Sequence, residues 1–197
     1  VNTNAPTYAS GSYLMYNSGN TYTTGTEWTP NAASGAGVPY NVTIGNNIAS
    51  SVCSFGSSSQ YRQANGTLLI SNATAGAGLT LSSSSGGDIR LAGDFNKQGG
   101  TFSCNSRAVN FYGSANQSWV SDATETIHYL NNYNTGGTVS INSSLNIGNS
   151  FTNSASASLS QTSGTLTFNS GSSFSNSGTL TVNSGAKAIA NAALSMK

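Results

Sequence analysis

The sequence predicts an all-β fold, a β-solenoid resembling a right-handed parallel β-helix, and three observations support this. More than half of the 197 residues are Gly, Ser, Thr or Asn, whereas charged residues make up 6%. Short runs with an apolar residue at every second position recur along the chain, as expected for strands that bury one face. Gly, Asn and Ser separate these runs and supply the residues that turns require.

The composition indicates one folded domain. Hydrophobic residues make up only 36% of the chain, but disordered chains usually combine low hydrophobicity with high net charge, and here the net charge is +1. Nine Tyr and seven Phe supply side chains to bury. Ser, Thr and Asn can stack and form hydrogen bonds between the coils of a solenoid, so the composition suits this fold.

The first forty residues differ from the rest of the chain. They contain all three Pro, Trp28 and five of the nine Tyr, and they lack the alternating pattern. A solenoid needs an atypical terminal unit, because an exposed end coil offers unpaired backbone groups. We therefore predict an N-terminal cap or arm over residues 1–40 and a solenoid repeat region over residues 41–197, within one structural domain.

Predicted strands follow one another from residue 41 onward. Each is a short alternating run bounded by turn residues. They cover residues 41–44, 67–70, 78–81, 88–91, 108–112, 126–130, 138–141, 164–168 and 178–182.

A degenerate repeat links the later strands. Residues 145–153 align with residues 168–176 at an offset of 23, which suits one coil of a β-helix. A two-sheet β-sandwich with short strands remains the alternative fold.

Cys53 and Cys104 lie in strand-like stretches, 51 residues apart. In a secreted protein they are a candidate disulfide, but sequence spacing does not establish proximity, and two buried free thiols are the alternative. The single His and two distant Cys do not match the ligand spacing of a metal site, so we expect no metal and no other cofactor.

Charge and hydropathy argue against two classes of partner. The six Lys and Arg are scattered, whereas nucleic-acid binding needs a clustered basic patch, so no nucleic-acid partner is expected. No stretch approaches the ~20 consecutive apolar residues of a membrane-spanning helix, so no membrane insertion is expected.

The acidic residues give little support to catalysis. A polysaccharide-active β-helix enzyme would need two acids close together on one face. Asp88 and Asp94 are separated by the turn residue Gly93, and Asp122 and Glu125 precede the strand that carries His128. We expect such side chains to be solvated or to accept hydrogen bonds from turn N–H groups, and we therefore predict no enzymatic activity.

Aromatic side chains are the best candidates for ligand contact. Tyr and Trp rings offer flat amphipathic surfaces that suit the apolar faces of sugars. The alternative is that these rings cover the solenoid end or fill its core. The candidate platform residues are Tyr13, Tyr16, Tyr22, Trp28, Trp119, Tyr129 and Tyr133.

Two parts of the chain resemble a known group of proteins. The segment YTTGTEW at 22–28, followed by GVPYNVTI at 37–44, resembles the opening of β-solenoid regions in large secreted surface proteins of Bacteroidota. The segment GDFNKQGGTF at 93–102, followed by VNFYGSANQSW at 109–119, resembles a repeat found in the same proteins. The resemblance implies export to the cell surface, often by the type IX route, and a place in an adhesin or other surface polymer.

The expected function is that of a non-catalytic extracellular module of a bacterial cell-surface protein. It would be a rigid stacked-coil spacer or polymer building block that mediates surface attachment. Its expected partners are other copies or neighbouring modules of the same protein, and polysaccharide. The alternatives are a carbohydrate-binding module that uses exposed Tyr and Trp and, third, a polysaccharide-active β-helix enzyme.

Overall fold

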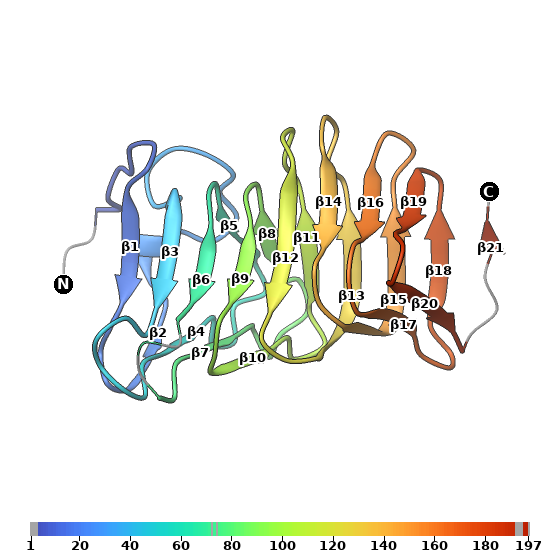
Figure 1. The fold of residues 1–197 in the computed structure, drawn as a ribbon. Coiled ribbons are helices and arrows are strands. Elements are labelled where there is room, and N and C mark those ends of the chain that lie inside the picture. Colours follow the sequence, from blue (N-terminus) through green and yellow to red (C-terminus); the bar gives the residue numbers. More distant parts are fainter. Residues whose placement is uncertain (1–3, 72, 74, 192–194, 197) are drawn as a thin grey trace.

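The chain folds into a β-solenoid, in which parallel strands stack along one axis (Figure 1). The computed structural model describes residues 4–71, 73, 75–191 and 195–196. Every pairing between described strands is parallel, and the strands of each sheet come from successive turns of the chain, about seven in all. The predicted β-solenoid is confirmed. The alternative β-sandwich is wrong, because sandwiches are built from antiparallel strands.

Sheet A runs along the whole solenoid and appears as the front row of strands in Figure 1. Its strand order follows the chain, with one strand per coil. In that order it contains β1 (Tyr13–Tyr16), β3 (Asn41–Ile44), β6 (Leu68–Ile70), β9 (Phe95–Lys97), β12 (Gln117–Ser121), β14 (Thr138–Ile141), β16 (Ser158–Gln161) and β19 (Thr179–Val182).

Two further sheets complete the coils. Sheet B contains β2 (Thr21–Thr23), β4 (Val52–Ser54), β7 (Gly78–Thr80) and β10 (Thr101–Ser103). Sheet C contains β5 (Arg62–Ala64), β8 (Ile89–Leu91), β11 (Ala108–Phe111), β13 (Glu125–Asn132), β15 (Leu145–Asn153), β17 (Thr165–Phe168), β18 (Ser173–Asn176), β20 (Lys187–Ala190) and β21 (Ser195–Met196).

The first coil has a 3₁₀-helix, η1 (Thr26–Trp28), in place of a strand of sheet C. The Trp28 ring enters the core, stacks beside Tyr16 and meets Phe55 edge-on, while its Nε1 donates to the carbonyl of Gln63. The predicted division after residue 40 falls directly before β3. N-terminal to it, β1 and β2 already pair with β3 and β4 in the same sheets.

The inward side chains of neighbouring coils stack in columns, as the alternating pattern predicts. The rings of Phe95 and Trp119 lie parallel with centroids 3.9 Å apart, and Phe151 stacks on Phe174 at 5.2 Å. Each large apolar side chain buried in this way contributes about 1.5–3 kcal/mol. One such column of sheet A consists of Leu14, Val42, Leu68, Phe95, Trp119, Ile141, Gln161 and Val182.

A ladder of buried asparagines replaces apolar residues in one column of sheet C. Asn132 Nδ2 donates to Asn153 Oδ1 at 2.9 Å, and Asn153 Nδ2 donates to Asn176 Oδ1 at 2.8 Å. The same two amides also donate to the carbonyls of Ser158 and Thr179, which open the next strands of sheet A. The ladder therefore joins adjacent coils and joins sheet C to sheet A.

The coils become shorter along the chain. In sheet A, Val42 pairs with Leu68, 26 residues later, whereas Ile141 pairs with Gln161, 20 residues later. A single fixed repeat length therefore does not describe this chain.

The predicted offset of 23 holds for only part of the repeat. Phe151 pairs with Phe174 and Asn153 with Asn176, as predicted. Ile147, however, pairs with Phe168, at an offset of 21, so the predicted alignment of Leu145 with Phe168 is wrong. The cause is local, because the four residues 169–172 between β17 and β18 stand opposite only two residues of the continuous strand β15.

Candidate functional site

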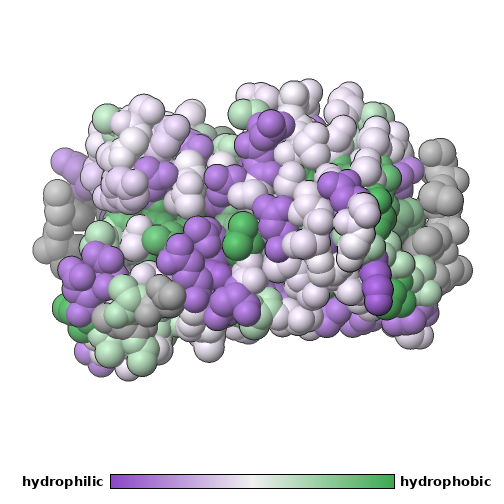
Figure 2. Space-filling model, in the orientation of Figure 1, coloured by the Kyte–Doolittle hydropathy of each residue, from purple (hydrophilic) through white to green (hydrophobic). Residues whose placement is uncertain are grey.

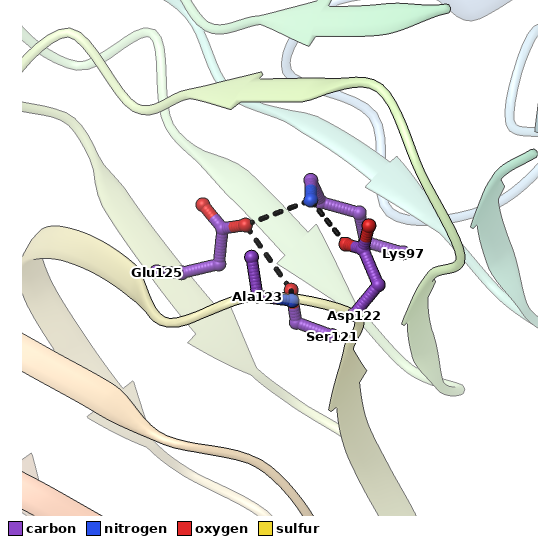
Figure 3. Close-up of polar contacts among 5 residues, drawn as sticks. All are labelled: Lys97, Ser121, Asp122, Ala123 and Glu125. Atoms are coloured by element: carbon purple, nitrogen blue, oxygen red, sulfur yellow. Dashed lines mark hydrogen bonds and ion pairs between the residues drawn. The ribbon is translucent and has the colours of Figure 1, made fainter. Parts of the chain in front are cut away.

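The densest group of charges lies where sheet A meets the start of β13 (Figure 3). Lys97 ends β9 and points inward, in the same column as Ile44 and Ile70 of the earlier coils. Its side chain is 4% exposed. Its ammonium group forms ion pairs with Asp122 and with Glu125, at 3.0 Å from Glu125 Oε1.

The backbone positions both acids. The N–H of Asp122 donates to the carbonyl of Lys97 at 3.0 Å, which continues the pairing of β12 with β9 by one residue and brings Asp122 beside the lysine. Glu125 is the first residue of β13, and its Oε1 also accepts a hydrogen bond from Ser121 Oγ at 3.1 Å. The Glu125 side chain is 11% exposed, whereas that of Asp122 is 40% exposed.

Burial and the two acids act in opposite directions on Lys97. Burial alone would lower the pKa of the ammonium group, but the hydrogen bonds and charges of Asp122 and Glu125 outweigh it and raise the pKa. The resting form of the cluster is therefore an ammonium ion between two carboxylates. Among the described residues, no three His, Cys, Asp or Glu side chains are placed to hold a metal ion.

The other three acids bind backbone N–H groups. Asp88 accepts from the N–H of Ala108 at 2.8 Å, and Asp94 accepts from the N–H of Ser118 at 2.7 Å, each in the next coil. Glu27 accepts from the N–H of Gly25 and from the hydroxyl of Tyr16. The prediction that acids in turns would accept backbone hydrogen bonds is confirmed at these three positions. It missed the ion pairs of Asp122 and Glu125, because the approach of Lys97 depends on the coil length.

The candidate platform aromatics separate into a buried group and a surface group. Trp28 and Trp119 are fully buried and Tyr16 is nearly so, which removes these three from any ligand platform. Their rings fill the core, where stacking over neighbouring coils holds them.

Two candidate aromatics are exposed at the N-terminal end. Tyr13 is 66% and Tyr22 is 45% exposed. Tyr22 lines an open hollow of about 340 Å³ together with Leu14, Tyr16 and Glu27. Since Tyr22 pairs with Cys53, a core residue of the next coil, this hollow is the uncovered interior of the first coil.

The last two candidates, Tyr129 and Tyr133, are half-buried and lie at the outer face of sheet C. Tyr129, Asn131, Asp88 and Arg107 line a second hollow, of about 380 Å³ and mainly polar. The ring of Tyr133 contacts that of Tyr112 on the preceding coil, with centroids 5.0 Å apart. Burial and, to a smaller extent, Tyr112 raise the pKa of the Tyr133 hydroxyl.

Tyr112 belongs to a stack that the sequence analysis missed. The guanidinium of Arg90 lies 3.5 Å from the ring centre of Tyr61 and 4.7 Å from that of Tyr112. The three residues come from successive coils of sheet C, so a correct register would have placed them side by side. The visible face in Figure 2 is mostly pale, with separate hydrophilic groups, in keeping with a surface of Ser, Thr and Gly.

Cys53 and Cys104 are free and buried, so the candidate disulfide is absent. Cys53 pairs with Leu79 and Leu79 with Phe102, which places Cys104 two strands away and two residues further along. Two strand spacings amount to about 9.6 Å, beyond the ~7 Å between Cα atoms that a disulfide can span. Burial raises the pKa of the Cys53 thiol above its ordinary value, and the positive charge of Arg62 opposes this only in part.

Comparison of the chain with protein-family models, with curated proteins and with solved structures found no match. None of the helices within the described residues is long and apolar enough to cross a membrane.

Proposed function

We propose that this chain is a non-catalytic structural module of a secreted bacterial surface protein, a rigid spacer that helps to hold the cell to a surface or matrix. The observation that carries the proposal is the unbroken stack of parallel strands from β1 to β19, with a core filled along its length. In such a stack each coil contacts only its neighbours, so length can be set by the number of coils without building a central pocket.

The polar residues support the same proposal. The buried asparagine ladder and the acids that bind N–H groups of the next coil both connect adjacent coils. The resemblance of residues 22–28, 37–44, 93–102 and 109–119 to surface proteins of Bacteroidota supports the extracellular location and neighbouring modules or copies as partners.

A deletion matched to the coil length tests the spacer. Removal of residues 141–160, one coil between the paired residues Ile141 and Gln161, should leave a folded protein that is one strand spacing shorter and still supports attachment. Removal of residues 141–150, half a coil, should unfold the C-terminal part, since inward and outward strands no longer stack. The measurements are circular dichroism, small-angle scattering and adhesion of cells that display each variant.

Two outcomes would contradict the spacer. If the full-coil deletion abolishes attachment while the fold persists, function resides in a site on the deleted coil. If antibodies against the chain label only permeabilised cells, the extracellular location is wrong.

Carbohydrate binding is the second candidate, favoured by the outer face of β13. Tyr129, Asn131 and Tyr133 alternate along this strand and span roughly 13 Å. The next coil places small residues beside them, Ser150 against Tyr129 and Thr152 against Asn131. The face therefore changes from bulky aromatic to flat and hydroxylated, which suits a sugar chain that contacts rings and hydrogen-bonding groups together.

Glycan-array and pull-down measurements with insoluble polysaccharides test this candidate. The double variant Tyr129→Ala/Tyr133→Ala should lose binding by at least tenfold, because the rings supply most of the contact area. The matched control is Tyr13→Ala/Tyr22→Ala at the N-terminal end, which should bind like the unchanged protein. Equal binding by both variants would exclude the β13 face as the binding site.

A further inference from the structure

The Lys97 cluster holds three chemically matched groups in a partly water-free corner. An amine, a carboxyl group and a second carboxyl group meet there, with Lys97 Nζ in contact with both acids (Figure 3). The lysine stands in a column that is apolar in the two preceding coils, at Ile44 and Ile70. A solvated position for this amine would have needed only an outward-facing residue.

Formation of an amide from an amine and a carboxylic acid has three requirements. The nitrogen must lose a proton, its lone pair must reach the carboxyl carbon, and one carboxyl oxygen must leave as water. Fixed proximity supplies the second requirement, because well-oriented intramolecular reactants reach effective molarities of about 10⁵–10⁸ M. A second carboxylate in contact with the same nitrogen supplies the proton transfers.

We propose that Lys97 Nζ and the side-chain carboxyl carbon of Asp122 form an intramolecular amide bond, with Glu125 as the proton-transfer group. The bond would join the coil of β9 covalently to the turn after β12. This inference goes beyond the proposed function and does not depend on it.

The reaction balances without any external reagent. Glu125 takes a proton from the Lys97 ammonium and passes it to the Asp122 carboxylate. The free amine attacks the carboxyl carbon, so a C–N bond forms. Glu125 then moves a second proton from nitrogen to the leaving oxygen, the C–O bond breaks, and one water departs. Both hydrogens of that water come from the former ammonium, the third stays on the amide nitrogen, and Glu125 ends as a carboxylate.

The geometry assigns different roles to the two acids. Glu125 is the more buried, and the Ser121 hydroxyl fixes its orientation, which suits a group that must transfer protons and remain in place. Asp122 lies in a turn, its side chain is 40% exposed, and its backbone N–H is held to the carbonyl of Lys97. Released water can leave on this exposed side.

Intact-protein mass spectrometry of the folded, full chain tests the proposal. The expected mass is that of the sequence less one water, and tandem spectra should show Lys97 and Asp122 in one branched tryptic peptide, with no cleavage after Lys97. The variants Lys97→Arg, Asp122→Ala and Glu125→Gln should all show the full mass. Asp122→Ala changes a half-exposed turn residue, so circular dichroism should show it to be folded.

Three results would overturn the proposal. The first is a folded, unchanged protein with the full mass after prolonged incubation. The second is loss of water at another position. The third is a folded Glu125→Gln variant that cross-links as completely and as fast as the unchanged protein, since Glu125 would then be a structural ion-pair partner only.

Discussion

Asn153 shows how a single polar residue can hold successive coils together. Its side chain is buried, accepts from Asn132 and donates to both Asn176 and the carbonyl of Thr179. Such a network stabilises a core only while every member is satisfied, because an unpaired buried polar group costs about 1–3 kcal/mol.

Substitution of Asn153 tests this ladder. We expect Asn153→Ala to lower the free energy of unfolding by roughly 2–4 kcal/mol, because it leaves polar groups of three neighbours unpaired and opens a cavity. Asn183→Ala is the control, since Asn183 is exposed and its amide oxygen accepts only from Ser160 Oγ; it should change stability by less than about 0.5 kcal/mol. Urea denaturation measures both, and equal effects would argue against the ladder.

Buried acids at the N-terminal end make stability depend on alkaline pH. Burial raises the pKa of both Cys53 and Tyr16 in the folded protein, so the folded state keeps protons that the unfolded chain releases. Stability should therefore be constant below about pH 8 and fall as pH rises, first through the unfolded pKa of Cys at ~8.5 and then through that of Tyr at ~10. Each group adds a slope of up to about 1.4 kcal/mol per pH unit.

Variants separate the two contributions to this pH dependence. Cys53→Ala should remove the part of the decline that begins near pH 8.5, and Tyr16→Phe the part that begins near pH 10, in urea titrations at several pH values. An unchanged slope in both variants would show that neither group controls the alkaline limb.

At the scale of strands and turns, close approach of adjacent coils places strict limits on side chains. A Cβ atom at Gly137, just before β14, would lie 2.2 Å from the backbone carbon of Ala115 on the preceding coil. At Gly148, inside β15, the nearest atom would be 3.5 Å away, an ordinary contact.

Alanine at these two glycines gives a matched comparison. Gly137→Ala should destabilise by about 1–3 kcal/mol or more, because backbone of the preceding coil must move. Gly148→Ala should stay within about 0.5 kcal/mol of the unchanged protein. Thermal and urea unfolding measure the difference, and similar values would mean that the coils adjust their spacing easily.

The same scale explains what the sequence could predict. The strands at 41–44, 138–141 and 179–182 have the predicted bounds, because alternation and turn residues are local signals. Contacts between coils depend on coil length, which falls from 26 to 20 residues in sheet A. A fixed offset therefore could not bring Lys97 to Asp122, Arg90 to Tyr61 and Tyr112, or separate Cys53 from Cys104.

For the whole molecule, nearest-neighbour stacking means that stability depends on position along the axis. β14 has a partner on both sides, whereas β19 and β20 each pair with one strand, and the described residues of β20 are exposed. We expect amide hydrogen exchange to be slowest in β11–β16 and to become faster toward β19 and β20. Uniform protection along the chain would indicate a single cooperative unit.

The shortening of the coils also gives the molecule a wide end and a narrow end. A second copy that continued the stack would have to place a coil of about 26 residues on one of about 20, so several residues would bulge from every junction. Eight strands of sheet A at ~4.8 Å each occupy about 38 Å of axis. A filament of these chains would thus narrow and widen once in about 38 Å, whereas within a longer solenoid the flanking coils would differ in girth at the two ends.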